Sequence, residues 1–548
     1  MLKNLFLRRR TPTALNVAWD EHAAPGVIRS LGLHPLVLLL LCLVFGFILL
    51  IFGGFLALSP IGGTIIFVAL LLLLGFFKMF AGIAPGAPWW MRGLFFSISS
   101  LLVLNVGFGS MFFGPASAPL PLTDLALAVA LLASAGHVLF YQKKIRLPLG
   151  MWGFFVWVVF NLAVHLPFDF QDYGMSAARD AIRILEMLYI IPAYVAISLA
   201  LSSGTKGQRW IKSFMYGTAI VVGLYGLFTP IQGMVAAISP AFPGVQKNEA
   251  IFGNYQTWPM AGLMGIFSVL LWRWAFPGKM TGWQKWWATL IVGSGLLAFA
   301  VLQSRAGYVF FALSMGVMLF IGGQGRQVRI MMAFIALCCA GLLAVELSGV
   351  ELKGRVGKLS LTGVVDHVLT LTGESKNSEF HGAAGGISQR KAWRAYSLGL
   401  WSESINSRIV GIGFGRMLTD MTRRGDNGEL VGVQDPHNSF VTALTRSGLV
   451  GLAVMLVVFV WVFYMAIVGY RRMRERNRPV AAYFLGVLLF HVYCMVNAWG
   501  EPHYEVAHYL IPSFFIYGAT WAVWDKFVRE AGKKKPELRG GFDLIKEQ

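Results

Sequence analysis

Long apolar runs recur along most of this chain, and each is about as long as a bilayer is thick. They lie near 35–58, 61–82, 93–113, 122–141, 149–167, 184–203, 211–232, 254–276, 285–303, 307–322, 329–347, 439–469, 480–498 and 508–525. A helix needs about 20 apolar residues to cross the hydrocarbon core. Because 56% of the 548 residues are hydrophobic and only 13% are charged, a water-soluble fold has too little interior to bury them. The sequence therefore predicts an all-α polytopic membrane protein with about 14 transmembrane helices.

Basic residues gather in the short segments between these runs. The formal net charge is +20, from 46 Lys and Arg against 26 Asp and Glu. If the N-terminus lies inside, the following dense basic clusters all fall on the cytoplasmic side, as the positive-inside rule requires: 142–146, 205–212, 278–285, 325–329, 471–478 and 526–535. We therefore expect both termini to be cytoplasmic, and we interpret the charge as orientation in the membrane, not as nucleic-acid binding.

The predicted organisation has five segments. They are a cytoplasmic arm (1–34), transmembrane helices 1 to 11 (35–347), a long periplasmic loop (348–436), transmembrane helices 12 to 14 (437–525) and a cytoplasmic tail (526–548). Within the loop, Trp393, Leu398 and Trp401 recur at helical spacing, which predicts an amphipathic helix over 388–404 at the external surface. The four cysteines lie in apolar runs without a C-x-x-C pair or a Cys/His cluster, so we expect no disulfide framework, metal or cofactor.

Two arginine sites fall on the predicted external side. Ser304 and Arg305 occupy a tight turn between two runs. Arg305 could simply reach toward lipid headgroups, but an arginine in so short an external turn goes against the positive-inside bias. Arg390 and Arg394 are spaced i, i+4, so they share a helix face and could present two guanidinium forks to one anion; the alternative is a solvated helix face.

The motif QDPHNSF opens the run that follows the long loop. Asp435 is predicted to cap this helix and Pro436 to take its first position, which places His437 in the first turn. A helix N-terminus favours the neutral imidazole and so suits a general base, although an interfacial histidine is the plainer interpretation. Asp435 is the one carboxylate near enough in sequence to orient His437, but we expect it to serve as the cap.

Two further features could bind phosphate. Arg179 and Arg183, again at i, i+4 spacing, precede the run at 184–203 and either hold lipid phosphate together or anchor the helix at the interface. The glycine-rich stretch VGIGFG at 410–415 could offer backbone N–H groups to an anion.

In this order, the motifs resemble the O-antigen ligase and O-antigen polymerase superfamily. QSRAGYVFF, SQRKAWRAY, IVGIGFG and PHNSFVTALTRSGLVGL follow the family's sequence of motifs, and IFGNYQTWPMAGLM at 251–264 looks like its Asn-containing helix. The resemblance covers about residues 210–470. It implies metal-independent, inverting transfer of a glycan from undecaprenyl pyrophosphate to a sugar hydroxyl, at the periplasmic face of the bacterial inner membrane.

The resemblance also implies roles for individual residues. The catalytic group is expected to comprise His437 as the base with Arg305 and Arg390, while Arg394, Asn438, Arg179 and Arg183 are predicted to bind substrate. Trp393 follows Arg390 by three residues where the family often shows four, so the choice between Arg390 and Arg394 as the loop arginine stays open.

The resemblance leaves two acceptors to choose between. A polymerase uses a second lipid-linked repeat unit and works with a chain-length regulator, whereas a ligase uses lipid A–core. PHNSFVTALTRSGLVGL and the length of the chain favour the polymerase. A lipid-linked oligosaccharide flippase is the rival from another class, but it should carry charges deep along a central cavity, and here they gather on one outer face.

Overall fold

A computed structural model describes most of the chain from residue 89 to residue 529. The described residues are 89–104, 112–113, 120–141, 145–202, 258–302, 304–349, 360–369, 381–420, 422–424, 430–432 and 434–529. The predicted arm at 1–34, the runs at 35–58, 61–82 and 211–232, the cluster at 205–212 and the first residues of the Asn-containing segment at 251–264 lie outside them.

Helices dominate the described residues. In the bundle they are α5 (Trp89–Leu104), α7 (Leu122–Gly136), α8 (Leu149–Tyr173), α9 (Met175–Glu186), α10 (Ile190–Ser202), α13 (Trp258–Ala275), α14 (Gly282–Leu302), α15 (Arg305–Gly316), α16 (Gly325–Leu347), α20 (Ser439–Met473), α21 (Arg478–Gly500) and α22 (Ala507–Val523). The long loop contributes α17 (Leu361–Leu369), α18 (His381–Ser402) and α19 (Ile405–Val410). Short antiparallel strands pair β1 (Phe112–Phe113) with β2 (Leu120–Pro121) and β3 (Thr422–Arg424) with β4 (Leu430–Gly432).

Six stretches of helix among the described residues are long and apolar enough to cross a bilayer. They are Thr123–Phe140, Leu149–Tyr173, Met175–Ser202, Gly325–Leu347, Ser439–Met473 and Arg478–Gly500. Because a bilayer leaves no water for unpaired backbone groups, apolar helices of this length belong in a membrane. The protein is therefore a helical membrane protein, as the sequence predicts. The total of about 14 spans and the orientation of the bundle stay predictions.

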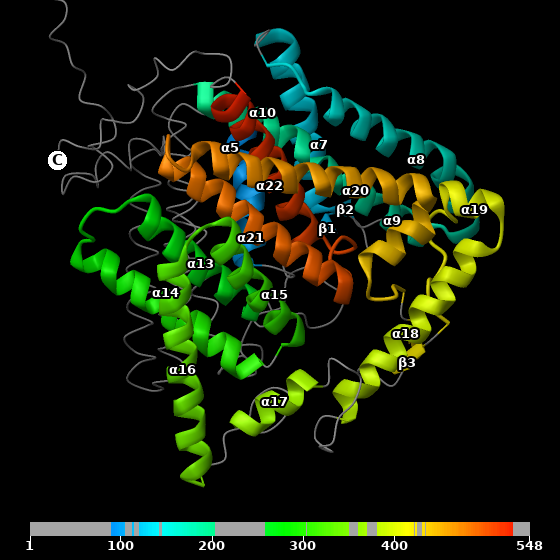
Figure 1. The fold of residues 1–548 in the computed structure, drawn as a ribbon. Helices are drawn as coiled ribbons and strands as arrows, with labels where there is room; N and C mark the ends of the chain where they lie inside the picture. The colour runs from blue at the N-terminus through cyan, green and yellow to red at the C-terminus, as the bar shows by residue number, and fades with distance from the viewer. Residues whose placement is uncertain are drawn as a thin grey trace, which may run out of the picture.

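The centre of the bundle is formed by α20, α21 and α22, with α10 packed against α22 (Figure 1). Large side chains such as Phe484, Phe514 and Tyr517 are fully buried there. The helix α16 lies at the edge instead, and only 6% of its apolar window is buried (Figure 1). We interpret its apolar surface as facing lipid.

A sharp bend divides α20 and positions the loop helices. Gly448 has φ 65° and ψ −167° inside the helix, and the chain after α19 crosses α20 at this point. Ile412 N–H donates to the Thr445 carbonyl at 2.9 Å. A Cβ atom at Gly411 would overlap the backbone of Arg446, and one at Gly448 would overlap the backbone of Ile409. Only glycine permits both the positive φ and this approach, which holds α18 and α19 against the bent end of α20 (Figure 1).

Candidate functional site

The loop helix α18 carries the two predicted arginines to the C-terminal end of α21. Arg390 donates through Nη1 to the Gly500 carbonyl at 2.6 Å and pairs through Nη2 with Glu501 at 2.9 Å. Arg394 donates through Nη2 to the Trp499 carbonyl at 3.0 Å. The prediction of a helix over 388–404 is thus confirmed, and its two arginines reach the same segment of chain.

The predicted start of α20 was wrong. Asn438, not Asp435, is the N-cap: its side-chain oxygen accepts from Val441 N–H at 3.0 Å, and the helix begins at Ser439. His437 therefore precedes the helix, with a left-handed φ of 50°. The Asn438 amide also donates to the Trp499 carbonyl at 2.9 Å, and the residue is only 1% exposed. The oxygen of Asn438 thus caps its own helix and the amide holds α20 against α21, so Asn438 fixes the position of its neighbour His437, while its predicted contact with substrate stays a prediction.

Glu501, which the sequence motifs do not single out, is the carboxylate that contacts His437. The Nδ1 atom of His437 lies 3.1 Å from Glu501 Oε2. Burial would raise the pKa of Glu501, but the hydrogen bond from His437 and the charge of Arg390 outweigh it and hold the pKa below its usual range. Because an ionised carboxylate only accepts hydrogen bonds, the contact assigns a hydrogen to Nδ1, and in the neutral form of the imidazole the lone pair then lies on Nε2.

The ring of His437 is further fixed by Trp393 of α18. The two rings stack with centroids 5.3 Å apart and planes at 29°. The imidazole is thus held by a stacked indole on one face and by a carboxylate at Nδ1. This arrangement leaves Nε2 as the atom that can take a proton from a ligand.

Arg305 begins α15 at the turn after α14. Ser304 caps the helix by accepting from Gly307 N–H at 3.3 Å, which fixes the turn that the sequence predicts. Arg305 lies within electrostatic reach of Arg390 and Glu501. The cluster, which we call the arginine cluster, consists of Arg305, Arg390, Arg394 and Glu501. It brings three guanidinium groups and one carboxylate together at one place in the fold.

Arg394 carries the least compensated of these charges. Its bonds from Nη2 go to backbone carbonyls, and its buried Nε has no hydrogen-bond partner among the described residues. Burial and the neighbouring Arg390 lower the pKa of Arg394 from its usual value. An anion bound here would relieve both the unpaired donor and the repulsion between the arginines.

The other predicted arginines lie apart from this cluster. On α9, Arg183 pairs with Glu186 at 2.9 Å. Arg179 is 55% exposed and lies 3.9 Å from Asp180. Arg183 is therefore neutralised within its own helix and most of the Arg179 side chain is exposed, so neither residue adds its charge to the arginine cluster.

The predicted use of the glycine-rich turn was also wrong. Phe414 N–H donates to Asp169 at 2.6 Å and Gly415 N–H donates to Asp180 at 2.9 Å. Asp180 also pairs with Arg446, a buried residue of α20, at 2.8 Å. These amides bind carboxylates of α8 and α9, so the turn ties the loop to the bundle and offers no cradle to a phosphate.

Glu501 could have been found from the predicted topology. It directly follows the run at 480–498, whose C-terminal end lies on the same predicted side as His437 and the turn at Arg305. A carboxylate at that position is within reach of the external basic residues once the helices pack. Among the described residues, no group of three or more His, Cys, Asp or Glu could hold a metal ion.

Comparison with known proteins does not identify a function for this site. No family model matches the chain. No curated protein matches it either. Any assignment of function therefore rests on the geometry of the site and on the sequence motifs.

Proposed function

We propose that this protein is a membrane glycosyltransferase that moves a glycan from undecaprenyl pyrophosphate to a sugar hydroxyl. The observation that carries the proposal is His437, oriented by Glu501, beside the three arginines of the arginine cluster. A pyrophosphate diester carries about one negative charge on each phosphate, and guanidinium groups are suited to bind such charges. The planar forks of arginine suit phosphate oxygens.

Each group then has a part in the reaction. The acceptor hydroxyl oxygen attacks the anomeric carbon while its proton passes to His437 Nε2, and the bond from that carbon to the lipid pyrophosphate breaks with its electron pair on the pyrophosphate. Attack from the opposite side inverts the configuration. Arg305 and Arg394 stabilise the charge that develops on the leaving group. Arg390, which pairs with Glu501, positions that carboxylate and, through it, the imidazole.

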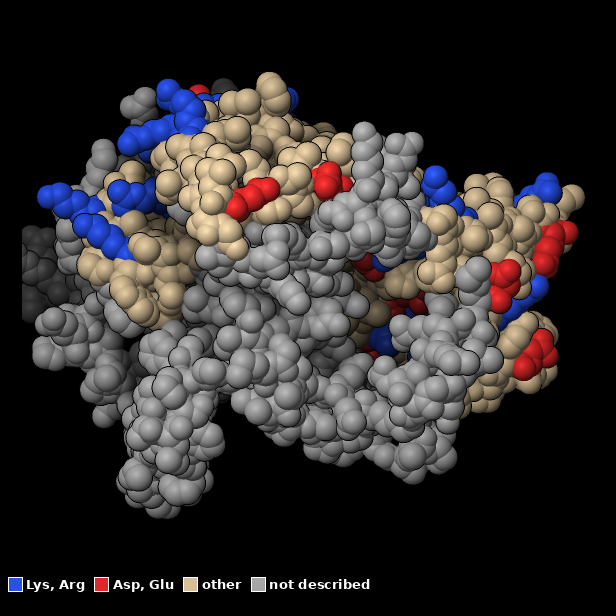
Figure 2. Space-filling view, turned by 90° about the horizontal axis from the view of Figure 1, so that it is seen from below, with Lys and Arg blue, Asp and Glu red and all other residues tan. Residues whose placement is uncertain are grey.

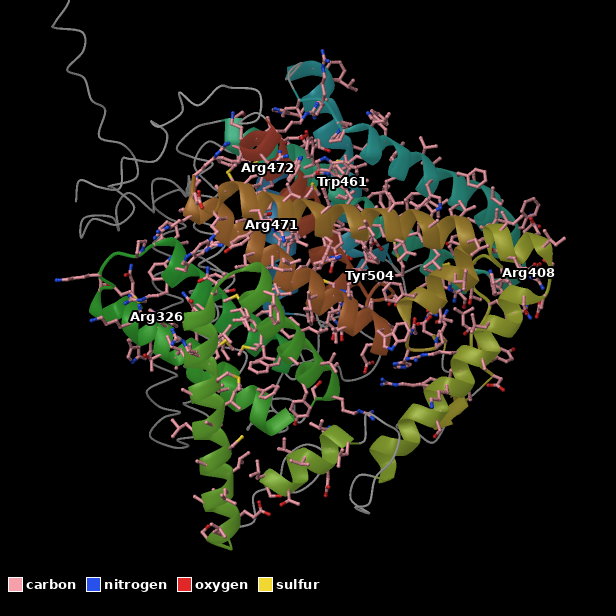
Figure 3. All side chains as sticks on the ribbon, viewed as in Figure 1. Arg326, Arg408, Trp461, Arg471, Arg472 and Tyr504 are labelled. Atoms are coloured by element: carbon pink, nitrogen blue, oxygen red, sulfur yellow. The ribbon has the colours of Figure 1, made fainter. Side chains whose placement is uncertain are left out.

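The distribution of charge supports a periplasmic site. Lys and Arg side chains gather at one end of the molecule, and at the other end they mix with Asp and Glu (Figure 2). Arg326, Arg471 and Arg472 lie toward the first end, whereas Arg408, next to α18, lies at the second (Figure 3). Under the positive-inside rule the first end is cytoplasmic, so the arginine cluster faces outward from a bacterial inner membrane with about 14 spans.

The acceptor follows from the resemblance of the sequence motifs. We propose a second lipid-linked repeat unit, which makes the protein an O-antigen or exopolysaccharide polymerase that a chain-length regulator would accompany. Transfer to lipid A–core is the alternative outcome. Offering both acceptors to the purified protein decides between them, since a ligase extends only lipid A–core.

The test separates donor binding from transfer. Protein in nanodiscs is supplied with the undecaprenyl-pyrophosphate-linked repeat unit from the cells that make it, and both steps are measured. His437→Ala should slow transfer by ~10²-fold or more, as expected for loss of a general base, while donor binding survives. Arg305→Ala should weaken both steps, and Arg305→Lys should restore little because an ammonium lacks the fork.

Arg408→Ala is the matched control for the arginine variants. Arg408 lies on the same end of the molecule, but its Nη2 donates to the Ser402 carbonyl at 3.1 Å, away from the arginine cluster (Figure 3). It should retain binding and transfer. Near-normal transfer by His437→Ala would contradict the proposed function.

A further inference from the structure

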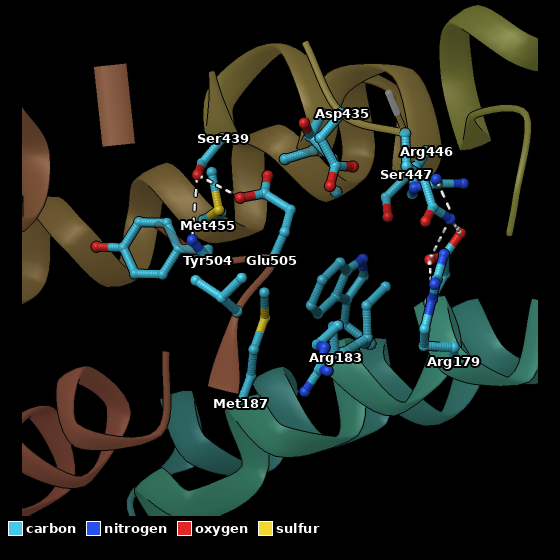
Figure 4. A pocket seen from close by; sticks show the side chains of 18 residues that line it. Arg179, Arg183, Met187, Asp435, Ser439, Arg446, Ser447, Met455, Tyr504 and Glu505 are labelled. Carbon is cyan, nitrogen blue, oxygen red and sulfur yellow. Dashed lines mark hydrogen bonds and ion pairs between the residues drawn. The ribbon is translucent and has the colours of Figure 1, made fainter. Parts of the chain in front are cut away.

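A second polar site lies next to the arginine cluster. A cavity of about 270 Å³ is lined by residues of α8, α9, both sides of the bend in α20 and the chain at 504–506 (Figure 4). Its volume is near the lower end of the ~300–1,000 Å³ typical of small-molecule sites. The cavity therefore has room for a small polar group, not for a lipid chain or a long glycan.

The cations in its wall are already neutralised. Arg183 is paired with Glu186, and Arg446 is paired with Asp180. Arg179 lines the cavity too, but most of its side chain is exposed. Because opposite charges satisfy the buried arginines, the cavity has little to offer a phosphate.

The groups that remain available are neutral or acidic. Ser447 is a buried residue, 4% exposed, whose hydroxyl makes no hydrogen bond with any described residue, and Figure 4 shows its side chain pointing into the cavity. Asp435 likewise has no hydrogen bond to the described part of the chain. Glu505 accepts from the Ser439 hydroxyl at 2.7 Å (Figure 4). Trp157 adds an aromatic side chain to the wall.

Glu505 differs from an ordinary surface carboxylate. Burial, followed by the nearby charge of Asp435, raises the pKa of Glu505 to about 8. This shift favours the protonated form of Glu505, and in that form the carboxyl group can donate a hydrogen bond as well as accept one. Asp435 adds a hydrogen-bond acceptor, and the Ser447 hydroxyl can donate or accept. The cavity therefore offers both the donors and the acceptors that the hydroxyl groups of a ligand need.

The position of the cavity relates it to His437. Asp435 and Ser439, both in its wall, lie two residues before and two residues after His437. The arginine cluster contacts His437 itself, because Glu501 lies against Nδ1 and Arg394 donates to the His437 carbonyl at 3.5 Å, and neither residue lines the cavity. The chain at 435–439 therefore connects the arginine cluster with the cavity.

We propose that this cavity binds one sugar ring of the acceptor glycan, next to the hydroxyl that His437 deprotonates. The proposal rests on the proposed function for the identity of the glycan as acceptor. The chemistry is that of a single pyranose: carboxyl and serine groups bind its hydroxyls, and the ring of Trp157 packs on its apolar face. Each unpaired buried group would gain a partner on binding.

Binding can be measured without any transfer reaction. Protein in nanodiscs is mixed with the methyl pyranosides of glucose, galactose, mannose and N-acetylglucosamine, and saturation-transfer NMR reports contact. At least one sugar should bind the wild type. Asp435→Asn and Ser447→Ala should each weaken that binding by about tenfold or less, the loss of one hydrogen bond. Thermal unfolding checks that each variant is folded.

A matched control is Glu403→Gln, which removes an exposed carboxylate that pairs with Arg416 at 3.1 Å on the same side of the molecule. It should bind sugar as the wild type does. The proposal is overturned if none of the four sugars binds, if the cavity variants bind them normally, or if inorganic phosphate displaces them from the cavity.

Kinetics distinguish this proposal from the proposed function. In the transfer assay, Asp435→Asn and Ser447→Ala should raise the KM for acceptor and leave the Kd for donor unchanged. If His437→Ala and Arg305→Ala behave as expected but acceptor KM does not move in the cavity variants, only the cavity proposal fails. If sugars bind in the cavity but no transfer occurs, only the proposed function fails.

Discussion

Replacing Glu501 by glutamine tests whether the carboxylate orients His437 for catalysis. Glutamine keeps the size of the side chain and removes its charge. The wild-type carboxylate can only accept, so it fixes the hydrogen of His437 on Nδ1, 3.1 Å away. A glutamine amide can also donate to Nδ1, which allows the tautomer with hydrogen on Nε2. That tautomer cannot take a proton from the acceptor, so Glu501→Gln should slow transfer.

The size of the effect follows from the exposure of the pair. A hydrogen bond to a charged group contributes about 1.5–3 kcal/mol. The side chains of His437 and Glu501 are 30% and 36% exposed, so solvent screening reduces this contribution to about 1–2 kcal/mol. At about 1.4 kcal/mol per tenfold, we expect the transfer rate to fall about 5- to 30-fold.

Donor binding should respond in the opposite direction. Glu501→Gln removes the one negative charge of the arginine cluster and releases Arg390 from its ion pair at 2.9 Å. The Kd for the lipid pyrophosphate donor should therefore stay the same or decrease. Single-turnover chain extension at saturating donor gives the rate, and a separate titration gives the Kd. A wild-type rate in the variant, or a slower rate explained by weaker donor binding, would refute the role assigned to Glu501.

Three further predictions test the cluster, the bend and the cavity. Arg394→Ala should raise the donor Kd by about tenfold or more, since it removes hydrogen bonds to a charged group, and Arg394→Lys should recover little of it; donor titration measures both. Gly448→Ala should destabilise the fold by about 2–4 kcal/mol, because alanine disfavours the left-handed φ and its Cβ would overlap Ile409. The control Gly293→Ala places a Cβ in open space and should be neutral or stabilising, and thermal unfolding measures both variants. The acceptor KM should be constant near neutral pH and rise above about pH 8, because the pKa of Glu505 is raised to about 8 and its ionisation adds a negative charge beside Asp435. Measuring KM over a series of pH values checks this, and the rise should be absent in Glu505→Gln.

Long periodic patterns in the sequence predicted the elements of this fold well. The run at 480–498 lies within α21 (Arg478–Gly500), and the run at 122–141 matches the candidate span Thr123–Phe140. The helix predicted over 388–404 is present as α18, with Trp393 among its buried residues. In each case, burial of one apolar face or of the whole helix determines the structure. The spacing of apolar residues along the sequence shows which face is buried, so the helix can be predicted from it.

Local sequence preferences predicted the wrong residue where a contact with a residue distant in sequence determined the structure. At 435–438 both Asp and Asn are good N-caps, and Pro436 favours the earlier one. Asn438 is nevertheless the cap, since its amide also bonds to Trp499, a residue 61 positions away. Glu501 was missed for the same reason, because its contacts are distant in sequence: it is 64 positions from His437 and 111 from Arg390.

The positions of the acids, more than those of the arginines, decide where an anion can bind. In the sequence, Arg183, Arg305 and Arg394 are all candidates for binding an anion at the predicted external surface, and Arg446 is not distinguished from the rest of its apolar run. In the fold, Glu186 neutralises Arg183 and Asp180 neutralises Arg446 within short ion pairs. In the arginine cluster the acids are placed differently: Arg390 pairs with Glu501, whereas Arg394 donates to backbone carbonyls and keeps a buried Nε without a hydrogen-bond partner among the described residues. A buried donor without a partner is unfavourable, so the proposed pyrophosphate ligand would complement Arg394 better than the paired Arg183 or Arg446.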